Sequence, residues 1–294
     1  MPVTLSSGIR DTLVTIQQTV AESTLAQTRL ATGKKVNTAL DNPLSFFAAA
    51  SLNQRADDLS GLQDNMQQAV RTLTAASSGI DGMTKLFQTA QGLANSAAAE
   101  SDPTRRNTLT TQFNTVLSQV DELMKNSGYG GTNLLNGDKL SVSFDAKSTT
   151  ATLSIQTNAG SMGTGALTSN NLGVATAAAG AWTNATTVAG GTSATTNTVG
   201  DAAIATKLTQ LSTAISTLRT EASGLGSTQA IVAARQAFTT SMVNTLKAGA
   251  GDLTLADLNE EGAKLSSLNT RGQLAQTALS LATQRDQQVL QLLR

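Results

Sequence analysis

The chain has 294 residues, and its 20 lysine and arginine residues balance its 20 aspartate and glutamate residues. This length suits two or more domains of about 100 to 200 residues each. A zero net charge gives no basic surface that would follow a phosphate backbone, so we expect no nucleic-acid partner. Cysteine and histidine are both absent, which removes disulfides, the commonest zinc ligands and the Ser-His-Asp triad. We therefore expect no cofactor and no metal.

The first residues carry no signal for ordinary secretion. Met1–Arg10 lacks both the basic region and the apolar region of about 7 to 15 residues that a cleavable signal peptide needs. The apolar run Phe46–Ala50 is far shorter than the roughly 18 residues that cross a bilayer. We expect no membrane segment, and export would need another route.

Apolar residues spaced three and four apart begin near the N-terminus and predict one face of a helix. The stripe is interrupted by Ser23 and Gln27. Water does not satisfy such a face, so it has to meet protein. Its apolar members are Ile9, Leu13, Ile16, Val20 and Leu30.

A second helix is predicted after the turn residues Asp41, Asn42 and Pro43, since proline disfavours a continuous helix there. From Leu59 to Ala94 the spacing of three and four continues without interruption for five heptads. This pattern is typical of a long helix that packs along one seam. The candidate seam residues are Leu59, Leu62, Met66, Leu73, Ile80, Met83 and Phe87.

The region after residue 100 contains a helix start and then a change of period. Ser101, Asp102 and Pro103 predict a capped helix that ends before Gly128. Apolar and polar residues then alternate over 140–144 and 152–155, with Asp145–Ser148 as the connecting turn. Alternation of this kind indicates a small β-hairpin, which needs a helix to cover its apolar face.

Residues 158–200 are rich in Gly, Ala, Ser, Thr and Asn and carry no charge. They form either a small β-rich domain or a surface loop, and a flexible insertion without a function of its own is an equally good interpretation.

Helical spacing resumes after this stretch, with Gly224 and Gly226 breaking it and with Gly249 and Gly251 separating it from a terminal helix. The first part adds Leu208, Leu211, Ile215 and Leu218 to the candidate seam of the helical domain. The terminal helix carries Leu265, Leu268, Leu279, Val289 and Leu293 along one face.

Adjacent carboxylates occur at Asp57 with Asp58 and at Glu260 with Glu261. Neighbouring residues on a helix point about 100° apart, so we interpret both pairs as solvated surface charges rather than as acid–base catalysts. No other catalytic motif is present, and we expect no enzyme.

Two segments resemble one family. Thr28–Asn42 is similar to the "RLSSGLRINSAKDD" stretch of bacterial flagellins, and Gln284–Arg294 is similar to their closing segment with its final Leu-Leu-Arg. The resemblance covers 1–157 and 201–294. Two departures are Asn42-Pro43, where the family usually has a second acidic residue, and Phe87–Ala97, which lacks the arginine-bearing pattern that innate immune receptors read.

The resemblance implies a mainly α fold, with long helices in a terminal coiled coil and a helical bundle. It divides the chain into a filament-core domain of 1–40 plus 256–294, a helical domain with the hairpin of 41–157 plus 201–255, and a variable, surface-exposed insertion of 158–200. The ten apolar residues of the two terminal stripes then become the candidate polymerisation interface.

The function implied by the resemblance is self-assembly into an extracellular helical filament, the bacterial flagellum, for swimming. The implied partners are further copies of the chain, the type III flagellar export apparatus and its chaperone, and the hook-associated and cap proteins. Isolated helices are marginal in water, so we expect the termini to fold as subunits assemble. The alternatives are a hook-filament junction protein, which differs in copy number, and a secreted adhesin that displays 158–200.

Overall fold

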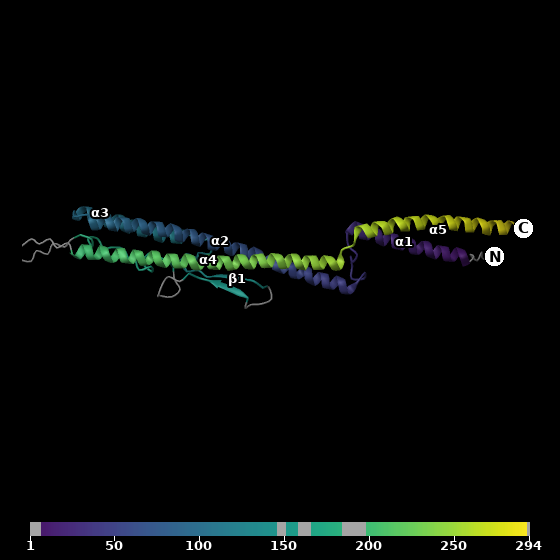
Figure 1. The fold of residues 1–294 in the computed structure, drawn as a ribbon, viewed down its shortest axis with the longest axis horizontal. Coiled ribbons are helices and arrows are strands. Elements are labelled where there is room, and N and C mark those ends of the chain that lie inside the picture. The colour runs from purple at the N-terminus through teal and green to yellow at the C-terminus, as the bar shows by residue number, and fades with distance from the viewer. Residues whose placement is uncertain (1–6, 146–150, 158–165, 184–197, 293–294) are drawn as a thin grey trace, which may run out of the picture. The chain divides into compact units, whose positions relative to one another are not determined.

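The computed structural model describes residues 7–145, 151–157, 166–183 and 198–292 (Figure 1). These residues are mainly helical, as predicted, with five long helices and one two-stranded sheet in the described part. The chain divides into two compact units. We call residues 1–57 with 242–294 the terminal unit, and residues 58–241 the central unit.

In the terminal unit, helix α1 (Ser7–Thr32) lies beside helix α5 (Leu258–Leu292), and the two run antiparallel (Figure 1). Helix α1 ends at a glycine in the left-handed conformation, because Gly33 has φ +69° and its N–H donates to the Arg29 carbonyl at 2.8 Å. Glycine adopts this conformation without strain, so it stops the helix cleanly.

The predicted turn before the second helix is confirmed. The Asp41 carboxylate accepts hydrogen bonds from the backbone N–H groups of Asn37 and Thr38, each at 2.9 Å. The Asn42 side chain accepts from the Ser45 N–H at 3.1 Å. Helix α2 (Pro43–Ala99) therefore begins at proline, behind a capping asparagine.

Helix α3 (Pro103–Asn126) begins as the sequence predicts, with the Asp102 side chain accepting from the Thr104 N–H at 2.8 Å. It ends before Gly128, and a short 3-10 turn, η1 (Leu134–Asn136), follows. The Asn133 side chain joins the two elements, because its amide group donates to the carbonyls of Met124 and Lys125 at 2.8 and 2.9 Å. These carbonyls lie at the end of α3, where no helical partner is available.

The predicted hairpin is confirmed as an antiparallel pair of β1 (Leu140–Ser143) and β2 (Thr152–Ile155). Val142 pairs with Leu153, and Val142 is 2% exposed because this face packs on the helical core. Of the expected turn Asp145–Ser148, only Asp145 is described, and 146–148 lie outside the described residues.

Helix α4 (Thr198–Thr254) corrects the prediction that glycines divide this region. The helix runs through Gly224, Gly226, Gly249 and Gly251 without a break. A glycine costs about 1 kcal/mol relative to alanine inside a helix, and burial of apolar neighbours of these glycines offsets that cost. The neighbours include Leu225 at 5% exposure and Ala250 at 2%.

The described part of the expected insertion, 166–183, has neither helix nor strand, yet it contributes to the core. Five of its apolar side chains are buried and not exposed as expected: Leu167, Leu172, Val174, Ala177 and Trp182. Trp182 is fully buried and lies against Phe113 of α3, with 4.9 Å between the ring centroids. The remainder of 158–197 lies outside the described residues.

Candidate assembly surfaces

The stripes of α1 and α5 share one contact along the terminal unit. Ile9 on α1 and Leu268 on α5 are each 4% exposed, and small residues such as Ala26 and Gly272 lie between the larger ones. Four more predicted residues are half-buried along the same helices: Ile16, Leu30, Leu265 and Leu279. Six of the ten predicted residues are thus covered, wholly or in part, within a single chain.

Two further predicted residues are exposed in this chain. Leu13 is 36% and Val20 is 59% exposed, because both lie beside the stripe that meets α5. The side chain of Val289 and all of Leu293 lie outside the described residues. The side of α1 that is covered therefore differs from the predicted stripe by one residue at several positions, with Thr12 in place of Leu13 and Thr19 in place of Val20. The covered residues are Thr12, Ile16, Thr19, Ser23, Ala26 and Leu30.

The same two helices expose several large apolar side chains that the sequence prediction did not include. Val14, Leu25, Leu274 and Leu281 are 52%, 39%, 65% and 58% exposed. Apolar side chains gathered in this number on one helix pair are typical of a surface that another protein covers. We call these four residues, together with Leu13 and Val20, the apolar margin.

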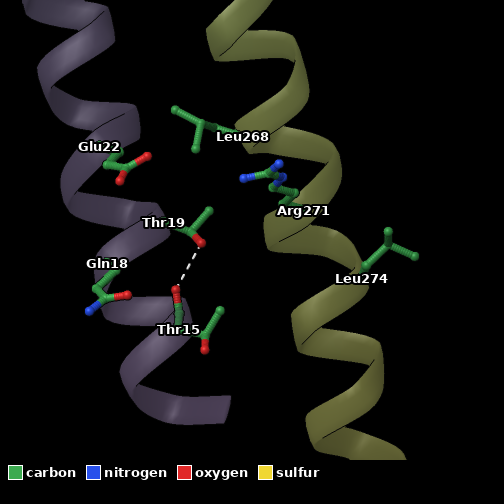
Figure 2. Close-up of a pocket in the computed structure, with 7 residues that line it drawn as sticks. All are labelled: Thr15, Gln18, Thr19, Glu22, Leu268, Arg271 and Leu274. Carbon is green, nitrogen blue, oxygen red and sulfur yellow. Dashed lines mark hydrogen bonds between the residues drawn. The ribbon is translucent and has the colours of Figure 1, made fainter. Parts of the chain in front are cut away.

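Figure 2 shows a groove of about 400 Å³ between α1 and α5. Its polar lining includes Glu22 of α1 and Arg271 of α5, and Arg271 extends toward α1. Leu274 points away from α1, next to the groove. The groove thus combines two opposite charges with an exposed leucine of the apolar margin.

A partly buried ion pair joins the two helices at the end where α1 finishes and α5 begins. Arg29 Nη1 lies 2.9 Å from Glu261 Oε1, and their side chains are 24% and 10% exposed. Glu261 lies in the first turn of α5, where the helix dipole favours a negative charge. The interpretation of Glu261 as a solvated charge is therefore wrong, because a partner 232 positions away covers it. Glu260, Asp57 and Asp58 are exposed.

Backbone pairing holds this end of the terminal unit together. The N–H of Lys35 donates to the Thr254 carbonyl at 2.8 Å, and the N–H of Ala256 donates to the Gly33 carbonyl at 3.0 Å. Asp257 then caps α5 by accepting from the Asn259 N–H at 2.9 Å. The break between α4 and α5 falls at this pairing, after the glycines rather than at them.

The predicted seam of the helical domain lies within the core of the central unit. All eleven residues belong to one buried cluster or pack directly against it. On α2, Met66, Leu73, Met83 and Phe87 are 0% exposed, Ile80 is 1%, Leu62 is 8% and Leu59 is half-buried. On α4, Leu211 and Leu218 are 0% exposed, Ile215 is 6% and Leu208 is half-buried.

Sequence reasoning missed one buried charged residue where three helix ends of this unit meet. Arg106 of α3 is 1% exposed, and its Nη2 lies 2.6 Å from Asp201 Oδ1 at the start of α4. The guanidinium also donates to the carbonyls of Glu100 and Trp182, at 2.5 and 3.3 Å. No sequence signal points to this role, because the partners are distant in the chain.

Two polar residues of α3 were missed for the same reason. Asn114 forms a pair of hydrogen bonds with the backbone of Ala177, donating to its carbonyl at 2.8 Å and accepting from its N–H at 2.9 Å. Asp121 accepts from the N–H and the hydroxyl of Ser169, at 2.7 and 3.1 Å. Together with Arg106 and the Trp182 carbonyl, these contacts attach 166–183 along α3.

Two classes of site have no support in the described part of the chain. No group of three or more acidic, cysteine or histidine side chains is arranged there to hold a metal. None of the described helices is long and apolar enough to cross a membrane.

Comparison with known proteins identifies the family. Residues 9–140 match the model of the bacterial flagellin N-terminal helical region, and residues 208–293 match that of the C-terminal helical region. The chain belongs to the flagellin family. It is 27% identical to flagellin FljM and 28% identical to flagellin FljN of Caulobacter vibrioides, in each case over 99% of this chain and 98% of the relative. It is 24% identical to a flagellin of Brucella melitensis, over 98% of both chains.

As a flagellin, the chain is a structural subunit of the extracellular flagellar filament and serves motility. The family match covers α1, α2 and α3 through its first model, and most of α4 with α5 through its second. The stretch between the two models contains β2 and the segment 166–183 attached to α3.

Proposed function

We propose that the chain polymerises by burying the apolar margin of α1 and α5 against the terminal units of neighbouring copies. The observation that supports this is the exposure of Leu13, Val20 and Leu274 on a helix pair whose facing side is already closed. Burial of one leucine or valine stabilises by about 1.5 to 3 kcal/mol. A contact between unlike faces that does not close on itself generates an open helical filament.

We infer that this polymerisation interface consists of the ten predicted residues together with the rest of the apolar margin. Residues buried between α1 and α5 stabilise the helix pair, and the exposed residues contact the neighbouring copy. The proposed filament-core domain is 1–40 plus 256–294, and the helical domain with its hairpin is 41–157 plus 201–255.

We further propose that folding of the terminal helices is coupled to assembly. An isolated helix pair with small residues along its contact gains little from that contact alone, while each ordered residue loses about 1 to 2 kcal/mol of backbone entropy. Burial among several copies offsets this loss. Far-ultraviolet circular dichroism before and after polymerisation tests the idea, and a monomer with full helicity would contradict it.

The partners beyond identical copies are also proposals. They are the flagellar export apparatus with its chaperone, and the hook-associated and cap proteins at the filament ends. We propose no nucleic-acid partner, no membrane partner and no enzymatic activity. The balanced charge and the lack of histidine and cysteine support these exclusions.

The decisive experiment is seeded polymerisation followed by electron microscopy. The variant Leu274→Asp places a charge on the apolar margin, and we expect it to lower the elongation rate at least tenfold. The matched control Leu274→Met keeps an apolar side chain of similar volume and should elongate like the natural chain. Normal elongation of Leu274→Asp would refute the role of this surface.

Truncation tests the other end of the same helix. A chain lacking Leu279–Arg294 loses the last part of the α5 stripe, so we expect it to remain unpolymerised with natural seeds. Normal filaments from this truncated chain would show that the interface lies elsewhere.

A further inference from the structure

The two terminal helices meet in one defined antiparallel register. Arg29 is opposite Glu261, with 2.9 Å between Nη1 and Oε1. Farther along the pair, Gly272 faces Thr19, because a Cβ atom on Gly272 would lie 3.9 Å from Thr19 Cγ2. Arg29 and Thr19 are ten positions apart on α1, and Glu261 and Gly272 are eleven positions apart on α5, so the two separations agree within one residue. The same register therefore holds over this length.

The apolar residues of the pair do not determine that register by themselves. Ile9 and Ile16 are one heptad apart on α1, and Leu265 and Leu279 are two heptads apart on α5. The middle of the pair carries the small residues Ser23 and Ala26. A slip of one heptad replaces Ile9 by Ile16 but Ile16 by Ser23, so it keeps only part of the apolar contact.

The charged residues respond differently to a slip. In the observed register, Arg29–Glu261 is the single ion pair that joins α1 to α5 within their described residues. A slip of one heptad in one direction brings Glu22 opposite Glu261, which sets two carboxylates against each other. A slip in the other direction carries Glu261 beyond Thr32, the last residue of α1.

The burial of Glu261 increases the energetic difference between the observed register and the slipped ones. Glu261 is 8% exposed, so water does not replace the arginine when the helices shift. Arg29 Nε and Glu261 Oε2 are buried without a hydrogen-bond partner. An ion pair with unsatisfied atoms adds little to stability. Selection of one helix register among several is the best-attested role of such buried polar groups.

We propose that Arg29 and Glu261, beside the backbone pairing of Lys35 with Thr254 and of Ala256 with Gly33, specify the register of α1 against α5 in the assembled subunit. This inference rests on the proposed function, because the register matters where the helix pair presents its apolar margin to neighbouring copies. A slipped pair would offset Leu13 and Val20 against Leu274, so a neighbour would meet a different surface.

Engineered cysteines report the register directly, since the natural chain has none. The pair Thr19→Cys with Gly272→Cys reports the observed register, because a Cβ atom on Gly272 would lie 3.9 Å from Thr19 Cγ2 and a disulfide joins side chains that are close in this way. The pairs Thr19→Cys with Leu265→Cys and Thr19→Cys with Leu279→Cys report the two slips of one heptad. Each pair is oxidised mildly in seeded filaments, and mixing with isotope-labelled subunits separates bonds within a chain from bonds between chains.

In the natural background we expect the observed-register disulfide to exceed either slipped one at least tenfold. In the apolar background Arg29→Met with Glu261→Leu, we expect that ratio to fall at least fivefold as slipped disulfides appear. The exchanged background, Arg29→Glu with Glu261→Arg, restores an opposite-charge pair and should retain the natural ratio.

An unchanged ratio in the apolar background would overturn the proposal, as would slipped disulfides in the exchanged background. If the variant Arg29→Met with Glu261→Leu does not polymerise, the disulfide ratio in the variant Arg29→Glu with Glu261→Arg decides alone. If the natural chain does not extend seeds at all, the result contradicts the proposed polymerisation and not the register. The ratio of observed-register to slipped disulfides is then measured in the monomer at high protein concentration, and that ratio tests the register.

Discussion

Arg106 Nη2 of α3 lies 2.6 Å from Asp201 Oδ1 in the first turn of α4, so one buried cation holds the starts of two long helices together. The same guanidinium donates to the carbonyls of Ala98 and Glu100 at the end of α2. Three helix ends and the Trp182 backbone thus converge on one side chain. Helix ends carry backbone groups without helical partners, and Arg106 satisfies several of these at once.

The first prediction follows from this convergence. Arg106→Ala leaves buried carbonyls without a donor, at about 1 to 3 kcal/mol for each unsatisfied group, so we expect the free energy of unfolding to fall by about 3 kcal/mol. Urea titration followed by the fluorescence of Trp182, the single tryptophan, measures it. Arg105→Ala is the matched control, because the Arg105 side chain is 73% exposed and its ion pairs contribute about 0 to 1 kcal/mol. Equal effects of the two substitutions would contradict the convergence.

The second prediction concerns close packing at Gly79 of α2. A Cβ atom there would overlap Ser127 Oγ and would lie 2.7 Å from Ser127 Cβ and 2.6 Å from Leu135 Cδ1. We expect Gly79→Ala to lower the free energy of unfolding by about 1 to 3 kcal/mol through overpacking. Gly92→Ala, in the same helix with open space around it, should instead raise it by about 0.5 to 1 kcal/mol. Thermal unfolding of both variants decides, and a stabilising Gly79→Ala would be incompatible with the contact.

Helical periodicity in the sequence detects residues that share one face of a helix. The α2 seam was predictable because residues such as Met66 and Phe87 repeat at helical spacing and therefore share one face. The start of α3 was predictable because Asp102 and Pro103 act on their own neighbours. In each case the information lies within a few positions along the chain.

The remaining features depend on partners that are distant in sequence. Glu261 resembles a solvated charge until Arg29 is placed beside it, and Arg106 gives no hint of Asp201. The residues of 166–183 have no period, yet Trp182 and Leu167 are fully buried. Local propensity at the α4 glycines favours a break, but packing of the helix outweighs it.

The third prediction concerns pH and the turn before α2. Donation from the backbone N–H groups of Thr38 and Asn37 lowers the pKa of the Asp41 carboxyl below its ordinary 3.8. A lowered folded-state pKa means that the carboxylate stabilises the turn above the unfolded pKa, and that this contribution is lost as the pH falls through the folded value. We expect the amide resonances of Asn37 and Thr38 to be constant from neutral pH to about 4 and to shift below it. In Asp41→Asn this acid shift should disappear, and a shift centred above pH 4 would contradict the assignment.

The fourth prediction tests whether 166–183 belongs to the core rather than to a dispensable loop. Asn114→Ala removes both hydrogen bonds to Ala177, and each such bond contributes about 0.5 to 1.5 kcal/mol. We expect a loss of about 1 to 3 kcal/mol in the free energy of unfolding, together with faster proteolysis between Ser169 and Trp182. Asn107→Ala, on the exposed side of the same helix, is the matched control and should change neither. Local release of the segment would speed cleavage more than global unfolding predicts, since local opening is governed by its own free energy. If both variants are cleaved at the natural rate, the side chain of Asn114 does not hold this segment, and its other contacts with the core suffice.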